Sequence, residues 1–149
     1  MSARIRRWWA RCSNERGQAI VETALVLPVL LLIVFGSLEF GRAINAWSIV
    51  TQASREGARV GAVSCVRDAV NCPTQVDAAV TNSLAGLDAG SAIVDFPLGP
   101  YASGQQFRVE VSYPVAIVTP LIGVFFGGPG CWPSCNSVTV HGDTTMRLE

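Results

Sequence analysis

The sequence contains no lysine, a single histidine and no internal repeat, and only 15% of its 149 residues are charged. No serine or cysteine nucleophile motif surrounds the histidine, His141, and no glycine-rich phosphate loop follows a predicted strand. The acidic residues are scattered and form no matched acid/base pair. These absences argue against an enzyme, a cofactor or a small-molecule substrate, and we expect His141 to be solvated.

The chain is neutral overall, but its charge is unevenly distributed. Residues 1–17 carry five arginines and one glutamate, a net charge of +4, whereas the remainder carries six arginines and ten acidic residues, a net charge of −4. No basic stripe or platform of aromatic residues is present, which argues against nucleic-acid binding. The length suits one membrane segment and one modest domain.

Cysteines are few and unevenly placed: Cys12 lies in the basic tail, and Cys65, Cys72, Cys131 and Cys135 lie beyond the apolar segment. Their spacings match no ordinary zinc pattern, and no C-x-x-C redox motif occurs. We therefore expect disulfides in an oxidising compartment rather than a metal site. Four cysteines allow three connectivities, of which we favour the local pairs Cys65–Cys72 and Cys131–Cys135.

One long hydrophobic run, "RGQAIVETALVLPVLLLIVFG", begins at Arg16. Ala19 to Leu38 is apolar apart from Glu22, Thr23 and Ser37. At ~1.5 Å per residue, this stretch spans the ~30 Å hydrocarbon core of a bilayer. Because the arginine-rich flank precedes it, we expect a single-pass helix with a cytoplasmic amino end.

Three ordinary signals compete with this interpretation. A cleaved secretory signal has an apolar core of ~7–15 residues, and the best small-residue site here, Gly41-Arg42-Ala43, is poor. The residues around Arg6-Arg7 do not support a twin-arginine signal. A plain signal anchor explains the length and orientation but leaves Glu22 unexplained.

Glu22 is the residue that calls for a specific explanation, because ionisable groups inside membrane helices are rare and functional by default. One reading places it shallow enough to reach the interface, near a helix start that tolerates negative charge. The other supposes a cut between Gly17 and Gln18. The new amine of Gln18 then lies on the same helix face as Glu22, four residues on, and the two charges neutralise each other within or between chains.

The segment from Glu15 to Val63 resembles the TadE-like minor pilins of the tight-adherence (Tad/Flp) pilus system. The resemblance rests on Arg16-Gly17, Glu22, Pro28, Gly36, Glu39-Phe40-Gly41-Arg42, and Ala53 with Glu56-Gly57-Ala58-Arg59. It implies a pseudopilin that a prepilin peptidase cuts between Gly17 and Gln18. It also implies partners among the other pilin or pseudopilin subunits and the pilus assembly platform, with lateral packing through the helix.

Several of these residues have a physical reading of their own. Pro28 removes one helix hydrogen bond, which membrane helices tolerate when neighbours compensate. Gly36 and Gly41 are small enough for another helix to approach closely. Glu39 and Arg42, one turn apart, are expected to form an ion pair, whose ordinary reading is a surface bridge of little energetic value.

We expect four regions: a cleaved basic leader, 1–17; a transmembrane helix, 18–40; its extracytoplasmic continuation, 41–64; and a small head domain, 65–149. The membrane would be the bacterial inner membrane, with the head outside the cytoplasm, and the mature protein could also enter the extracellular pilus. The amino end would stay in the cytoplasm.

The continuation of the helix is predicted to reach about Val63. One of its faces repeats at intervals of three and four residues: Ile44, Trp47, Thr51, Ser54, Ala58 and Gly61. This face becomes small toward its end, which suits close packing on a sheet or on another helix. Arg55, Glu56 and Arg59 lie on a more polar side, either as a solvated face or as a contact with another subunit.

The head is predicted to be α+β. A second helix is expected over Thr74–Leu87, with Thr74 and Asp77 as a capping box and Gly86 at its end. Alternation predicts a weak strand near 91–96 and clearer strands over 105–113 and 137–148, which form an antiparallel sheet with one covered face. The predicted inward residues are Ala92, Val94, Phe96, Phe107, Val109, Val111, Tyr113, Val138, Val140, Thr144, Met146 and Leu148.

The apolar stretch from Pro114 to Cys135 is too short to span a membrane. We favour a buried turn or short helix, and the alternative is an exposed patch with Phe125, Phe126 and Trp132. Three hypotheses follow for the whole protein: a processed pilus subunit, an uncleaved signal-anchored binding protein of the envelope, and an envelope enzyme.

Overall fold

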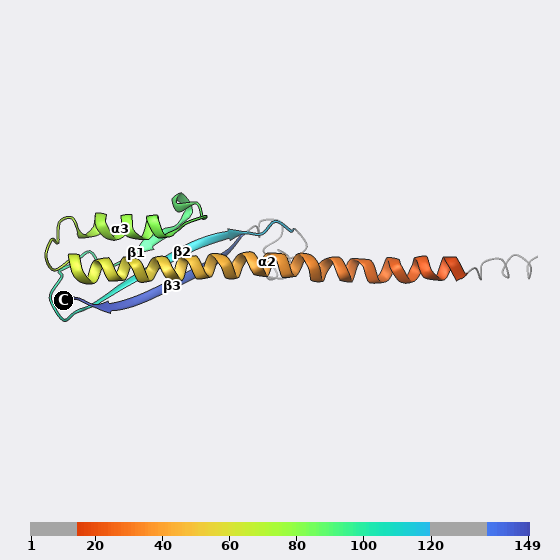
Figure 1. Cartoon of the computed structure of the whole chain (residues 1–149), viewed down its shortest axis with the longest axis horizontal. Helices are drawn as coiled ribbons and strands as arrows, with labels where there is room; N and C mark the ends of the chain where they lie inside the picture. The colour runs from red at the N-terminus through yellow and green to blue at the C-terminus, as the bar shows by residue number, and fades with distance from the viewer. Residues whose placement is uncertain (1–14, 120–136) are drawn as a thin grey trace, which may run out of the picture. The chain divides into compact units, whose positions relative to one another are not determined.

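The computed structural model describes residues 15–119 and 137–149 (Figure 1). Its elements are α2 (Glu15–Ser64), α3 (Cys72–Ser83), the short 3-10 helix η1 (Ala89–Ser91), β1 (Ile93–Asp95), β2 (Gln106–Ala116) and β3 (Ser137–Arg147). The strands form one antiparallel sheet in the order β1-β2-β3. The predicted α+β class is therefore confirmed. Two compact units divide between Leu38 and Glu39.

The described residues of the first unit, 15–38, form the amino-terminal part of α2 and are mostly apolar. Pro28 lies inside α2, and the helix is nevertheless a single element of 50 residues. The predicted end near Val63 is confirmed, since α2 ends at Ser64. Long apolar side chains along this part are exposed.

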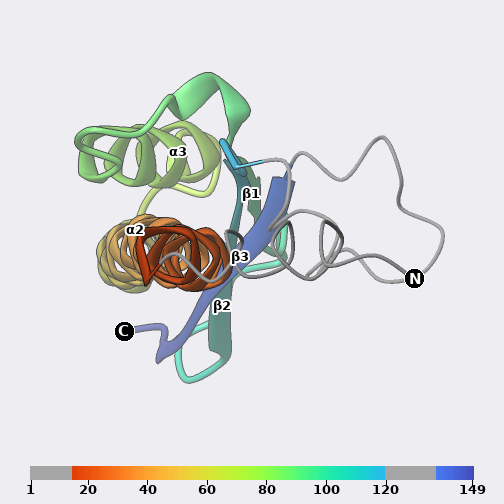
Figure 2. The same ribbon diagram turned by 90° about the vertical axis from the view of Figure 1, so that its right-hand side faces the viewer.

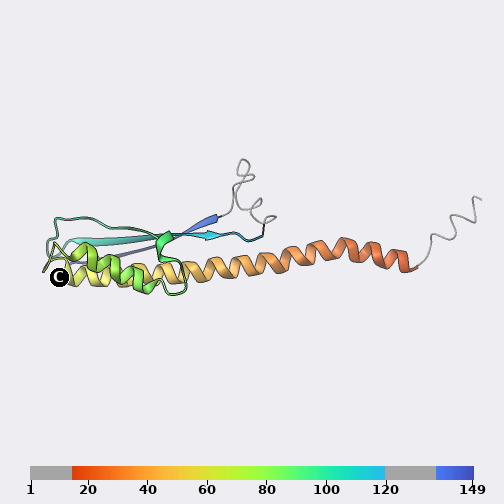
Figure 3. The same cartoon turned by 90° about the horizontal axis from the view of Figure 1, so that it is seen from above.

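In the second unit, α2 and α3 lie on the same face of the sheet (Figures 2 and 3). Alternation along β2 creates that covered face, because Phe107, Val109, Val111 and Val115 are buried and the residues between them are not. The core joins both helices to the sheet: Val50, Ala53, Ala58, Cys65, Cys72, Val76, Val80, Leu84, Phe107, Val109, Val111 and Leu148. The predicted one-sided sheet is thus confirmed.

Small residues allow α2 to lie very close to the sheet. A Cβ on Gly61 would collide with the ring of Phe107, and a Cβ on Gly142 of β3 would lie 2.8 Å from the Thr51 backbone. Within this contact Ser54 is buried, and its hydroxyl lies 2.9 Å from that of Thr144. The carbonyl of Ala62 accepts a hydrogen bond from the Glu149 amide at 3.1 Å, which fixes the end of β3 to the same helix.

Only the small end of the predicted face of α2 packs on the head. Ser54, Ala58 and Gly61 are buried, but Ile44 and Trp47 are exposed. The buried positions near the start of the contact are instead Ala46, Val50 and Ala53, on a neighbouring face. Helical periodicity identifies an apolar face but does not reveal how far along the helix the head covers it.

The predicted bounds and cap of the second helix are wrong. α3 begins at Cys72 rather than Thr74, its N-cap is Asn71, and no side chain caps it. Pro73 at the first turn supplies a preset backbone angle, so the helix starts before the expected capping box. It ends at Ser83, and Gly86 follows with a positive φ of 86°.

Two strand details also differ from expectation. β2 continues through Pro114 to Ala116, so residues 114–116 are strand rather than a turn or helix. β1 pairs only with residues 110–112, so the missing amide of Pro114 lies where β2 is an edge. Val138, near the start of β3, is exposed rather than covered. Residues 120–135 of the predicted turn lie outside the described residues.

Candidate functional site

The surface of α2 before the head is the first candidate site. Side chains from Gly17 to Phe35 are exposed, and α2 is long and apolar enough to cross a membrane. Exposed apolar surface on this scale is unfavourable in water, so lipid or another helix must cover it. The segment therefore has the length and composition of a membrane-spanning helix.

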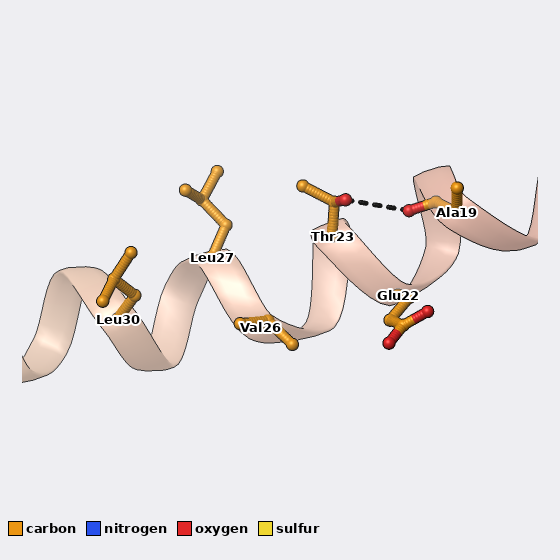
Figure 4. Close-up of a pocket in the computed structure, with 6 residues that line it drawn as sticks. All are labelled: Ala19, Glu22, Thr23, Val26, Leu27 and Leu30. Atoms are coloured by element: carbon orange, nitrogen blue, oxygen red, sulfur yellow. Dashed lines mark hydrogen bonds between the residues drawn. The ribbon is translucent and has the colours of Figure 1, made fainter.

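Glu22 is the one acidic residue on that surface. It lies beside a shallow apolar groove of Ala19, Thr23, Val26, Leu27 and Leu30 (Figure 4). The hydroxyl of Thr23 donates to the carbonyl of Ala19 at 2.8 Å, so Thr23 satisfies its own polar group locally. The Glu22 side chain makes no hydrogen bond or ion pair with the described side chains and backbone of residues 17–119 and 137–149. Its carboxylate is thus available to a group from outside this part of the chain.

The predicted processing site lies at the start of the same exposed surface. Gly17 and Gln18 are both within α2, and both are exposed. Gln18 precedes Glu22 by four residues, so the two share a helix face. With Gly17 attached, however, the Gln18 nitrogen is a neutral amide and offers no charge to Glu22. Processing at this bond stays a prediction.

Gly36 and Gly41 leave open space on the helix surface. A Cβ built on either would meet no neighbouring atom within 4 Å among the described residues. Neither glycine is therefore required by the packing of this chain on itself. An approaching helix remains a reason for small residues at these positions.

Glu39 is the residue at which α2 enters the second unit, and its side chain is only 12% exposed. Its Oε1 accepts hydrogen bonds from the amides of Val118 and Thr119 at 2.8 and 2.9 Å, and from the Thr119 hydroxyl at 3.1 Å. Arg42 Nη1 lies 3.2 Å from Oε2, so the predicted ion pair is confirmed. The contacts with residues 118–119 were not predicted, because no local pattern links positions 79 and 80 residues apart.

The Glu56-Gly57-Ala58-Arg59 motif divides between two environments. On the exposed side of the helix, the Arg59 guanidinium donates two hydrogen bonds to the Glu56 carboxylate, of 2.7 and 3.1 Å. These bonds lower the pKa of Glu56 and raise that of Arg59. Inside, Gly57 and Ala58 are buried, and a Cβ on Gly57 would lie 2.5 Å from Val80. The motif therefore joins a surface ion pair to close packing between α2 and α3.

A disulfide joins Cys65 and Cys72, whose Cα atoms are 4.8 Å apart, and so connects the end of α2 to the start of α3. Inside this loop the carboxylate of Asp68 accepts from the amide and the side chain of Asn71, at 3.1 and 2.7 Å. These bonds lower the pKa of Asp68. Cys131 and Cys135 lie outside the described residues, so their predicted pairing stays a prediction.

The outer face of the sheet carries the single histidine. His141 Nδ1 lies 2.8 Å from the Ser112 hydroxyl and 3.7 Å from Glu110, and its side chain is exposed, as expected. Arg108 lies 3.5 Å from both Glu110 and Asp143. In the described part of the chain, no three histidine, cysteine or acidic side chains come together in a way that could hold a metal ion.

Comparison with known families adds one decisive observation. Residues 17–59 match the family model of TadE-like proteins. The amino-terminal part of this chain is TadE-like. The predicted resemblance is therefore confirmed, and it covers Glu22, Glu39 and the Glu56–Arg59 motif. The match relates this segment of the chain, and not the head beyond it, to the TadE-like family.

The match ends before the disulfide, α3 and the sheet. No curated protein matches the chain, and no solved structure matches it. The TadE-like segment thus combines the exposed apolar helix with the part of α2 that packs on the head. The disulfide, α3 and the sheet lie outside the segment that matches the family model.

Proposed function

We propose that this protein is a TadE-like minor pilin or pseudopilin that acts in the assembly of a tight-adherence pilus. A prepilin peptidase cuts it between Gly17 and Gln18, and α2 then packs laterally against other subunits. The observation that carries the proposal is the coincidence of the TadE-like match with an exposed apolar helix, on which Glu22 has no partner in the described part of the chain.

The cut provides a partner of opposite charge for Glu22. A carboxylate in hydrocarbon is costly, and so is a free ammonium group. Removal of the leader creates an ammonium group on Gln18, one helical turn from Glu22. Pairing the two, in one chain or between chains with an axial offset, reduces both costs. The pairing also favours assembly of processed subunits over unprocessed ones.

Orientation follows from the distribution of arginine. The leader contains Arg4, Arg6, Arg7, Arg11 and Arg16. Positively charged flanks are retained in the cytoplasm, so the amino end stays there and residues 41–149 lie outside the inner membrane. The Cys65–Cys72 disulfide supports this orientation, because such bonds persist in oxidising compartments. The head is then placed to contact other pilus subunits and the assembly platform.

The direct test is to express the full chain in cells with and without the prepilin peptidase of a Tad system and to determine its mass and amino-terminal residue. We expect a chain that starts at Gln18 only when the peptidase is present. A Gly17→Leu variant is the matched control, because it leaves Glu22 and the apolar stretch unchanged. A chain that still starts at Met1 or Ser2 beside an active peptidase would instead favour an uncleaved, signal-anchored binding protein.

A further inference from the structure

Three large apolar side chains on α2 are exposed just beyond the apolar stretch. Phe40, Ile44 and Trp47 are 63%, 47% and 53% exposed. They are spaced by four and three residues, so at about 100° per residue they lie within about 60° of one another on the helix. We call them the aromatic stripe. No side chain of the described head covers them.

The aromatic stripe continues a helix face that the head buries further along. The same face leads to Ser54, Ala58 and Gly61, which are buried against the sheet and α3. The covered residues are small, whereas the uncovered ones are large. This change in size indicates that the two halves of the face meet different partners, since a closely packed protein surface favours the small residues.

Charged groups near the aromatic stripe are on the other sides of the helix. At about 100° per residue, Glu39 lies about 100° and Arg42 about 160° around the axis from Phe40. These two residues pair with each other, and Glu39 also binds the backbone of residues 118–119. The stripe itself is uncharged, and the next residue along it, Thr51, donates its hydroxyl to the carbonyl of Trp47.

The depth of the aromatic stripe relative to a bilayer can be calculated from the helix rise. Phe40, Ile44 and Trp47 follow Leu38 by two, six and nine residues, or about 3, 9 and 14 Å in an upright helix. The headgroup layer adds only about 5–8 Å on each side of the hydrocarbon core. Transmembrane helices tilt by about 20° on average, and side chains point back toward the helix start. A tilt toward the stripe brings Trp47 down to the headgroups, whereas the opposite tilt lifts it into water.

We propose that the aromatic stripe is a membrane-surface anchor: Phe40, Ile44 and Trp47 lie in the headgroup layer of the bilayer that α2 crosses and set the direction in which the helix tilts. Lipid is favoured over a neighbouring helix because Trp concentrates at headgroups and large apolar residues cover the boundary between headgroups and acyl chains, whereas helix contacts in membranes favour small residues. This tilt turns the Glu39–Arg42 pair toward water. The inference rests on the membrane span in the proposed function.

The test uses tryptophan fluorescence of the full chain in phosphatidylcholine vesicles whose acyl chains carry bromine at a shallow or a deep position. Trp8, Trp9 and Trp132 are replaced by phenylalanine, which leaves Trp47 as the emitter. We expect shallow bromine to quench Trp47, with weaker quenching by deep bromine and with partial protection from aqueous acrylamide.

Two variants, both with Trp47→Phe added, complete the design. Asn45→Trp is the matched control, because Asn45 is exposed at a similar height on a different side of the helix. We expect bromine to quench it less than Trp47. Leu30→Trp reports on the span itself and should be quenched by deep bromine.

Equal quenching of Trp47 and Asn45→Trp, with Leu30→Trp still quenched, would overturn the anchor and leave the membrane span intact. No bromine quenching of Leu30→Trp would overturn the span and the proposed function with it. A third outcome would also overturn the anchor. If Trp47 is protected from acrylamide only at high protein concentration, and bromine does not quench it, the stripe binds a protein partner instead.

Discussion

Glu39 is a carboxylate with an identifiable structural task. It binds two successive backbone amides and a hydroxyl of residues 118–119 through one oxygen, and Arg42 through the other. Hydrogen bonds to a charged group contribute about 1.5–3 kcal/mol each when buried, and less where water can replace them. Glu39 therefore positions the end of the β2 segment on α2, a role that the ion pair alone does not explain.

This role can be measured by hydrogen exchange in the full chain. In Glu39→Ala, we expect the amides of Val118 and Thr119 to exchange faster, while those of Val109 and Val111 in the core of β2 are unchanged. Arg42→Ala is the control, because it removes the ion pair and leaves the amide bonds in place. Equal acceleration by both variants would assign the effect to the ion pair instead.

Asp68 makes the folding stability of the head depend on pH, with lower stability expected in acid. Its bonds to Asn71 hold its pKa below the ordinary aspartate value. A carboxyl whose pKa is lower in the folded state stabilises the fold above its unfolded pKa, and this contribution is lost as the pH falls through the folded pKa. We expect the melting temperature to fall on acidification, with a smaller fall in Asp68→Asn. Thermal melts of both proteins between neutral and strongly acidic pH test this, and identical pH profiles would contradict it.

At the scale of elements, the contact between α2 and the sheet depends on glycines, whose lack of a side chain leaves room for close packing. Gly61 leaves room for the ring of Phe107, so Gly61→Ala forces one of them to move. Overpacking of this kind costs about 1–3 kcal/mol, which exceeds the gain of up to about 1 kcal/mol from replacing a helical glycine. We expect lower stability of the head in chemical denaturation of the detergent-solubilised chain.

Gly41→Ala is the matched control for Gly61→Ala. Gly41 lies in the same helix, and a Cβ there meets nothing within 4 Å. The helix-propensity gain then acts without a steric cost, so this variant should be as stable as the parent or more stable. A loss in Gly41→Ala equal to that in Gly61→Ala would show that the ring of Phe107 is not the cause.

The elements that the sequence predicts well are those whose pattern and burial coincide. Alternation along 105–113 describes β2 well there, since Phe107, Val109 and Val111 on one face are buried. The start of α3 was missed because it depends on Pro73 in the first turn and on the bonds of Asp68 with Asn71, and the spacing of apolar residues carries no trace of them. How far the head covers the predicted face of α2 was not predicted, because it depends on where the sheet ends.

At the scale of the whole molecule, a substitution of Glu22 tests membrane insertion and pilus assembly separately. The apolar stretch remains in Glu22→Ala, and removal of a charge favours insertion further. Incorporation into pili should fall, because the ammonium group of a processed Gln18 loses its partner. Carbonate extraction measures insertion, and the protein content of sheared pili measures assembly. Thr23→Ala is the control on the adjacent position, and undiminished incorporation of Glu22→Ala would remove the charge-pairing role.

Close approach of β3 to α2 also has a mechanical consequence. At Gly142 the strand backbone lies against the backbone of Val50 and Thr51, and neighbouring positions interlock through Gly61 with Phe107. At Gly142 no side chain separates the two backbones, so we expect this part of α2 and β3 to rotate about the helix axis together.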